Sequence, residues 1–181
     1  MPHRLAFFTV GIMHEPVGHP RTQGFLDRVP GVYAAADASA GFHSRSIRDV
    51  STWKHSWGDP VVPQCYPKVD DLEQFAMTLS LWDSLESVAA FTYKGPHGEA
   101  LANRRDWFQS LGLPPYVAWW VSDDQQVNWK EAAERLDHLH SHGSSAFAFS
   151  FAKPFDSNGN SVRLDHVAMQ AQATKNSAPK P

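Results

Sequence analysis

A histidine and an arginine stand at helical spacing near the middle of the chain, in a pattern that suits proton transfer. His97 opens the segment HGEALANRRDWF, and His97, Leu101 and Arg104 would share one face of a helix. Near a helix start the dipole favours a neutral imidazole, as a general base requires, and Arg104 could stabilise an enolate or phenolate. The alternative is structural: His97 caps the helix and Arg104 pairs with a nearby carboxylate.

Two further side chains could take part in the same chemistry. Tyr93 precedes His97 by four residues, and a tyrosine–histidine pair can shuttle a proton. A tyrosine held in the core with its hydroxyl satisfied is the alternative. His14 follows the first apolar run, where a loop held by a rigid strand often carries a catalytic group. His97, Tyr93, Arg104 and His14 are therefore the candidate catalytic residues.

The candidate substrate-binding residues are one histidine and five tryptophans. His43 and Arg45 would lie on one face of a strand, facing either solvent or a polar site. The tryptophans could line an apolar site or simply fill the core, and they are Trp53, Trp57, Trp107, Trp119 and Trp120. Two of them fall in the Pro-rich stretch 49–71, a loop of about 23 residues that we expect to act as a lid over a pocket.

Other kinds of site find little support in the sequence. The triplet His138, His140 and His142 lacks the Glu of a His-Glu-x-x-His site, and no metal site is predicted. Cys65 is the single cysteine, has no neighbouring base and is not expected to be a nucleophile. We find no glycine-rich phosphate loop and no nucleotide or flavin fingerprint, so we expect no cofactor.

Composition narrows the class of protein. The 181 residues carry a formal net charge of -3, which argues against a nucleic-acid partner. No apolar run approaches the length of a membrane span, and the opening MPHRLAFFTVGIM does not read as a signal peptide, so we expect a soluble cytoplasmic protein. With 7 Trp, 11 Phe and 4 Tyr, an aromatic-lined site is expected.

The elements that must position these side chains follow from apolar periodicity. Five segments have the composition or alternation of strands: 5–13, 41–48, 72–82, 116–122 and 145–152. Four segments have helical patterns. The first is 20–38, with a break at Pro30-Gly31, and the second follows a cap at Asp83 or Ser84 and is broken at Lys94-Gly95-Pro96. The others are 97–108 and 129–142, the latter between the cap Asn128 and Gly143.

This order predicts an α+β fold. It is β-α-β-β-α-β, the ferredoxin-like split βαβ pattern, with one helix inserted before the fourth strand and a helix–strand appendage after it. We expect one domain over residues 1–152. The polar tail 153–181 is expected to be partly disordered, above all in its last ten residues, with a short strand or arm over 161–169.

Three sequence blocks resemble a known family. They are SLWDSLESVAAFTYKGPHGEALANRRDWF from Ser80, then PPYVAWWV, then EAAERLDHLHSHG ending at Gly143. These blocks resemble the DUF3291 family, which is similar to the dimeric α+β barrels, and the resemblance covers about residues 5–152. The chain departs from many relatives at Ser122 to Gln126, where they carry Pro-x-Gly-His.

The resemblance implies a homodimer whose sheets pack face to face, with a pocket between sheet and helices in each protomer. Strands that are apolar on both faces favour the same assembly. Related barrels include cofactor-independent monooxygenases, haem-binding enzymes, muconolactone-type isomerases and polyketide cyclases.

The leading expectation is a cofactor-independent enzyme of secondary metabolism that acts on a hydrophobic, aromatic or polyketide-like small molecule. It would isomerise, cyclise, dehydrate or oxygenate that molecule, with His97 or His14 as base, Tyr93 as relay and Arg104 on the oxyanion. The alternatives are a haem or small-molecule binding protein, with His14, His43 or His97 as axial ligand, and a purely structural dimer.

Overall fold

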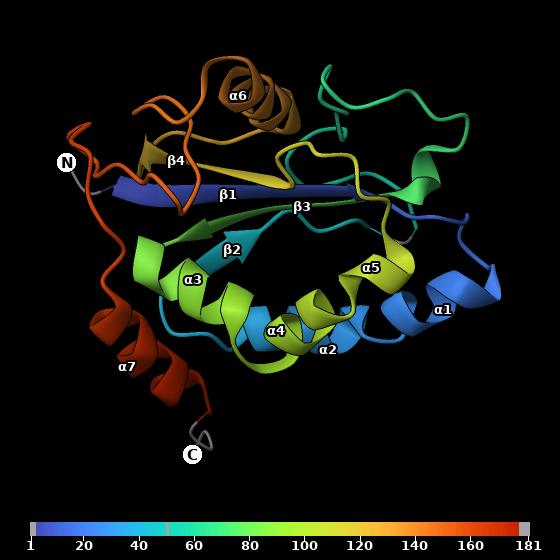
Figure 1. Cartoon of the computed structure of the whole chain (residues 1–181), viewed down its shortest axis with the longest axis horizontal. Helices are drawn as coiled ribbons and strands as arrows, with labels where there is room; N and C mark the ends of the chain where they lie inside the picture. Colours follow the sequence, from blue (N-terminus) through green and yellow to red (C-terminus); the bar gives the residue numbers. More distant parts are fainter. Residues whose placement is uncertain (1–2, 50, 178–181) are drawn as a thin grey trace.

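A four-stranded antiparallel sheet organises the computed structural model, which describes residues 3–49 and 51–177 (Figure 1). The strands are β1 (His3–Ile12), β2 (Phe42–Arg45), β3 (Phe75–Trp82) and β4 (Tyr116–Ser122). Their order across the sheet is β2-β3-β1-β4, with every pair antiparallel. This order is that of the split βαβ pattern, so the predicted ferredoxin-like α+β fold is confirmed.

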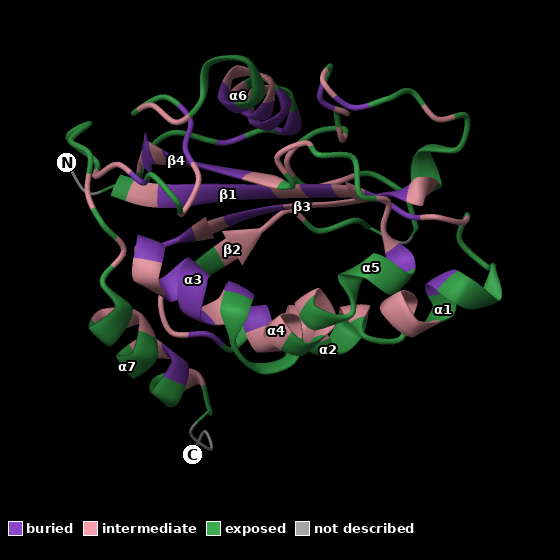
Figure 2. Ribbon diagram, in the orientation of Figure 1, coloured by how far each residue is buried: buried purple, intermediate pink, exposed green. Residues whose placement is uncertain are grey.

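Side chains of the central strand β1 alternate between two cores. Leu5 and Phe7 join the core on one face, and Phe8 and Val10 join the core on the other. The sheet is thus covered on both faces, and Figure 2 shows buried residues along β1 and on the sheet-facing sides of α3 and α6.

One face of the sheet is covered by a layer of helices. They are α1 (Pro20–Leu26), α2 (Val29–Asp37), α3 (Leu85–Tyr93), α4 (Gly95–Ala102) and α5 (Arg104–Trp107). The sequence predicts that a proline breaks a helix in two places, and in the structure both prolines have a different role. Pro30 lies in the first turn of α2 and Pro96 in the first turn of α4, so each proline begins a helix instead of interrupting one.

The opposite face is covered by α6 (Trp129–His142), whose predicted bounds are confirmed. The side chain of Asn128 caps the helix by accepting from the backbone N–H of Glu131 at 2.9 Å, and Gly143 ends it with φ 74°. Leu136 and other apolar residues of one stripe are buried against the sheet.

The long loop 49–71 shares this face with α6. The Tyr66 hydroxyl donates to the backbone oxygen of Val10 at 3.2 Å, and the Asp137 carboxylate on α6 accepts from the N–H groups of Gln64 and Cys65. The homodimer is expected in part because the strands are apolar on both faces, but this second apolar face is covered by α6 and the loop of the same chain. The homodimer therefore stays a prediction, and it rests on the family resemblance alone.

The predicted fifth strand is wrong. Residues 145–152 make one isolated bridge, Ala118 to Phe149, beside β4. Their three phenylalanines do not share a face: Phe147 is 47% exposed beside α6, Phe149 is fully buried, and the Phe151 ring lies 5.5 Å from that of Phe7. A chain that turns between Ser145 and Ala148 cannot keep strand alternation.

The C-terminal segment differs from its prediction as well. Instead of a strand or arm over 161–169, helix α7 (His166–Ser177) lies alongside α3. Gln172 donates to the Ser87 hydroxyl at 3.0 Å, and the Asn176 side chain accepts from the N–H of Ala40 at 2.9 Å. Six of the ten final residues thus belong to α7, and 178–181 lie outside the described residues.

Candidate functional site

The centre of the sheet is partly open to solvent on the face that α1 to α5 cover, called here the helix side. Thr9 on β1 faces Thr78 on β3, and the next pair along is Gly11 and Ala76. All four residues, called here the central patch, are partly exposed, whereas Phe8 and Leu79 on the other face are at most 1% exposed. The covering helices bury few of their own residues here, since α4 has no buried residue and α2 has only Ala36.

Aromatic rings stand at both ends of the central patch. At one end, the rings of Phe7, Tyr116 and Phe151 lie within 5.5 Å of one another, centroid to centroid. At the other end, Phe108 packs on Gly11 so closely that a Cβ there would lie 2.9 Å from its ring. A planar apolar molecule on this surface would meet rings at both ends.

An ion pair borders the central patch on the β2 side. Arg45 pairs with Asp37 of α2 at 3.0 Å, and its guanidinium lies 4.0 Å from the ring centroid of Tyr33. Burial raises the pKa of the Tyr33 hydroxyl, which is therefore neutral at physiological pH. The Arg45 charge is already neutralised by a carboxylate.

His43 does not share this environment, although the sequence predicts that it lies on the same face as Arg45. The register between β2 and β3 shifts between Phe42 and Ser44, which breaks the alternation. His43 is exposed and contacts the carboxylate of Asp83, which also pairs with Arg4 at 3.1 Å. It thus belongs to a surface ionic cluster.

His97 has its reactive nitrogen defined by a hydrogen bond. Its Nδ1 lies 2.9 Å from the backbone oxygen of Thr92, and its ring centroid lies 4.8 Å from that of Phe91. A carbonyl only accepts, so Nδ1 carries the hydrogen and Nε2 keeps its lone pair. Burial lowers the pKa of His97, although the Thr92 contact opposes this, and the ring is neutral near pH 7.

The Nε2 atom of His97 is available to a ligand. Within 3–49 and 51–177 no hydrogen-bond partner of this atom is found, and it is not among the unpartnered polar atoms sealed from solvent. An uncharged imidazole with an open Nε2 can accept a proton.

The predicted convergence of His97, Tyr93 and Arg104 is not seen. Tyr93 is 44% exposed and packs edge-on against Phe151, and Arg104 is exposed and donates to the backbone oxygen of Leu101 at 3.0 Å. Among the residues that the structure describes, no hydrogen bond or ring contact joins any two of the three. The chain leaves α3 after Tyr93 and breaks again between α4 and α5, so the helical spacing on which the prediction relied does not persist.

His14 is hydrogen-bonded to the backbone around Trp107. The N–H of His14 donates to the backbone oxygen of Trp107 at 2.8 Å, and its Nε2 lies 3.3 Å from that of Arg105. Trp107 is buried against Phe25, with the Arg28 guanidinium 5.1 Å from its ring centroid. These contacts attach the end of β1 to α5.

The other candidate tryptophans have separate environments. Trp119 is fully buried under α6, and Trp120, on the helix side, donates to the backbone oxygen of Phe155 at 2.7 Å. Trp57 packs on the α6-side core, whereas Trp53 is 64% exposed. The loop 49–71 therefore lies on the sheet face opposite the central patch and does not cover it.

Two surface hollows are lined by residues outside the central patch. One, of about 370 Å³, is bordered by Pro114, Tyr116 and Leu139, and the other, of about 380 Å³, by Asp49, Lys54 and His55. In the first, the Tyr116 hydroxyl already accepts from the N–H of Phe151 at 3.2 Å. In the second, the Asp49 carboxylate is already bonded to Ser51 and Thr52.

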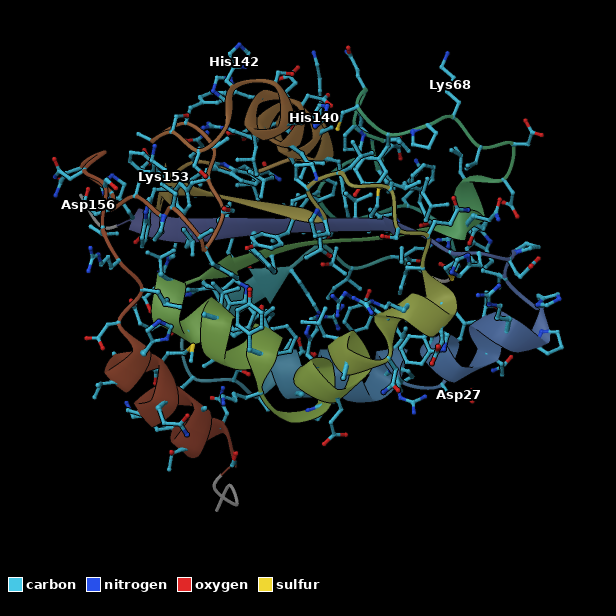
Figure 3. All side chains as sticks on the ribbon, in the orientation of Figure 1. Asp27, Lys68, His140, His142, Lys153 and Asp156 are labelled. Atoms are coloured by element: carbon cyan, nitrogen blue, oxygen red, sulfur yellow. The ribbon has the colours of Figure 1, made fainter. Side chains whose placement is uncertain are left out.

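The remaining histidines and the cysteine do not add a second site. The described part of the chain holds no group of three or more His, Cys, Asp or Glu that could bind a metal ion. His138 and His142 stack at 4.4 Å, and Figure 3 shows His140 and His142 on the α6 side of the sheet. Burial raises the pKa of the Cys65 thiol to about 12, which disfavours a nucleophilic role.

Sequence reasoning missed Thr9 and Thr78. A signal existed, because Thr9 interrupts an otherwise apolar run and alternation places Thr78 on the polar face of its strand. That the two would face each other under the helix layer depends on the pairing of β1 with β3, which alternation alone does not give.

Comparisons with known proteins point to one family. A family model described as "Domain of unknown function (DUF3291)" matches residues 4–165. A search of curated proteins finds no match. Among the described residues, no helix has the length and apolar character needed to cross a membrane.

Proposed function

The chain belongs to the DUF3291 family, whose description assigns no function, and we propose that it is a proton-transfer enzyme for an apolar, aromatic or polyketide-like small molecule. The substrate would lie on the central patch, between the cluster of Phe7, Tyr116 and Phe151 at one end and Phe108 at the other. The enzyme would need no redox cofactor, since its step is a proton transfer.

One observation carries this proposal: the hydrogen bond from Nδ1 of His97 to the backbone oxygen of Thr92. It leaves Nε2 as the basic atom of an imidazole that burial keeps neutral. We propose that Nε2 removes a proton from a carbon next to a substrate carbonyl, forming an enolate and an imidazolium. The imidazolium then returns the proton at another position, which isomerises the substrate or commits it to cyclisation or dehydration. A positioned base of this kind contributes about 10²–10⁴ in rate.

Proton exchange tests the proposal without knowledge of the natural substrate. The probe is 2-tetralone, an aromatic ketone with exchangeable protons beside its carbonyl, followed by NMR in deuterated buffer. The protein should accelerate exchange, and His97→Asn should remove about 10²-fold or more of that acceleration. Asparagine can still donate to the Thr92 oxygen, so the variant removes the base and keeps the local contact.

His142→Asn is the matched control, because His142 lies at the end of α6 on the other side of the sheet. It should exchange the probe as the wild type does. Exchange that is absent in the wild type, or equal in the wild type and His97→Asn, would contradict the proposal.

A second candidate function rests on the same hydrogen bond. Histidines that bind metals commonly donate their other ring N–H to a carbonyl, so Nε2 of His97 also suits an axial haem ligand. A haem-binding protein would give a Soret band on titration with haemin that His97→Asn shifts or removes. A colourless protein with no such band would favour the enzyme.

We further propose that the protein is a cytoplasmic homodimer. The proposal relies on the resemblance to dimeric barrels, since both sheet faces are already covered within one chain. Light scattering should give twice the chain mass of 20.2 kDa. A mass of one chain at micromolar concentration would contradict it.

A further inference from the structure

We propose that the hydroxyl pair Thr9–Thr78 is the subsite that binds the substrate's oxygen, and that this oxygen is a neutral ketone or phenol oxygen. The inference rests on the proposed function, because it places the same substrate on the same surface. It adds the recognition of one atom and excludes a carboxylate or phosphate at that position.

The hydrogens of the two hydroxyls carry the inference. Their Oγ1 atoms lie 2.7 Å apart, and either can be the donor. Each hydroxyl has one hydrogen, so the contact uses one of the two. No other hydrogen bond of either hydroxyl is found within 3–49 and 51–177. The pair therefore keeps one hydrogen for a further acceptor.

Ser80, two residues further along β3 on the same face, has a hydroxyl that both donates and accepts a hydrogen bond, and it serves as a comparison. Its Oγ donates to the backbone oxygen of Phe7 at 3.3 Å and accepts from Nε1 of Trp82 at 2.9 Å, and the residue is only 8% exposed. Thr9 and Thr78 are both partly exposed and lack such partners. The residues that carry the free hydrogen are thus partly open to solvent at the centre of this sheet face.

The charges nearby set the kind of oxygen. The cation on the neighbouring strand, Arg45, is paired with Asp37 and packed on Tyr33, so it adds no net positive charge. Transferring an ionised group to a half-buried surface without a counter-charge is costly. A neutral oxygen on a planar ring system fits, since the hydroxyl pair supplies its donor and the aromatic rings at the two ends of the patch meet its edges.

Two ligands that differ by one oxygen test the inference. The probes are 2-naphthol and naphthalene, and their affinities are compared in the wild type, Thr9→Val, Thr78→Val and the double variant. Valine has nearly the shape of threonine and lacks the hydroxyl. The wild type should prefer 2-naphthol by about 3- to 10-fold, and the double variant should bind both about equally.

Two controls separate recognition from structure. Thr78→Ser keeps a hydroxyl and should keep most of the preference, and Thr174→Val removes an exposed hydroxyl on α7 and should change nothing. If the double variant fails to fold, as judged by its melting, the single variants carry the comparison. Each leaves one hydroxyl hydrogen that has lost the neighbour which orients it, so each should lower the preference only in part.

The outcomes distinguish this inference from the proposed function. A preference for 2-naphthol that survives both valine substitutions would overturn the subsite, even if His97-dependent exchange is present. A preference that depends on the threonines, without any exchange of 2-tetralone, would support the subsite and overturn the proton-transfer function. A wild type that binds neither probe would overturn the subsite.

Discussion

At the scale of single residues, one hydrogen bond decides which nitrogen of His97 can react. Because Nδ1 donates to the Thr92 oxygen, the lone pair is on Nε2, and burial keeps the ring uncharged. The sequence predicts His97 as a candidate base from its place near a helix start. It could not predict the Thr92 contact, which depends on how the chain turns from α3 into α4.

The lowered pKa of His97 predicts a pH dependence of stability. The unfolded chain protonates this histidine near pH 6.5, whereas the folded chain does so only at lower pH. Stability from this group is therefore complete above about pH 6.5 and is lost as pH falls through the folded pKa. The melting temperature of His97→Asn should fall less than that of the wild type between about pH 7.5 and about pH 5.5.

His55 also has a lowered pKa, mainly from burial, so part of the decline should remain in the variant. Equal declines in the wild type and His97→Asn would show that His97 is protonated alike in both states. Differential scanning fluorimetry at matched ionic strength makes the comparison.

At the scale of elements, the break between α3 and α4 positions His97. Gly95 adopts φ 57°, and Gly98 packs on the end of α3, where a Cβ would lie 2.7 Å from the backbone oxygen of Tyr93. The sequence predicts a break at Lys94-Gly95-Pro96 but places the next helix start at His97. It cannot say whether a proline ends or begins a helix, since both positions suit the ring.

Gly98→Ala should destabilise the protein by about 1–3 kcal/mol, because a backbone oxygen cannot move aside as a flexible side chain can. Gly31→Ala is the matched control: Gly31 lies within α2, and a Cβ there meets nothing within 4 Å. It should raise stability by about 0.5–1 kcal/mol. Urea unfolding measures both, and equal effects would contradict the tight packing of α4 on α3.

Asp137 holds the 49–71 loop on α6 through the N–H groups of Gln64 and Cys65, at 2.9 and 2.8 Å. Asp137→Ala should release this part of the loop and remove a group that helps to raise the Cys65 pKa. The thiol should then react several-fold faster with a disulfide reagent, as Cys reactivity follows thiolate fraction and access. Glu134→Ala, on the exposed side of the same helix, is the control and should leave the rate of thiol modification unchanged. A rate that is also unchanged in Asp137→Ala would show that Asp137 does not hold the loop over Cys65.

At the scale of the whole molecule, the order of elements was sufficient to predict the sheet. The strand order β2-β3-β1-β4 follows from β-α-β-β-α-β, and the bounds of β4 and α6 follow from their patterns. The side of the sheet that α6 and the 49–71 loop cover could not be predicted, because strands apolar on both faces suit a partner chain equally well. The path of 145–152 was missed because alternating phenylalanines occur here without strand pairing.

The central claim is that Nε2 of His97 accepts the substrate proton, and the pH profile of 2-tetralone exchange tests it most directly. In the wild type the rate should rise to a plateau with a midpoint below pH 6.5, as the lowered pKa of His97 requires. In His97→Asn this titration should be absent and the rate close to that of buffer. A wild-type profile without such a midpoint, or one that His97→Asn retains, would contradict the account.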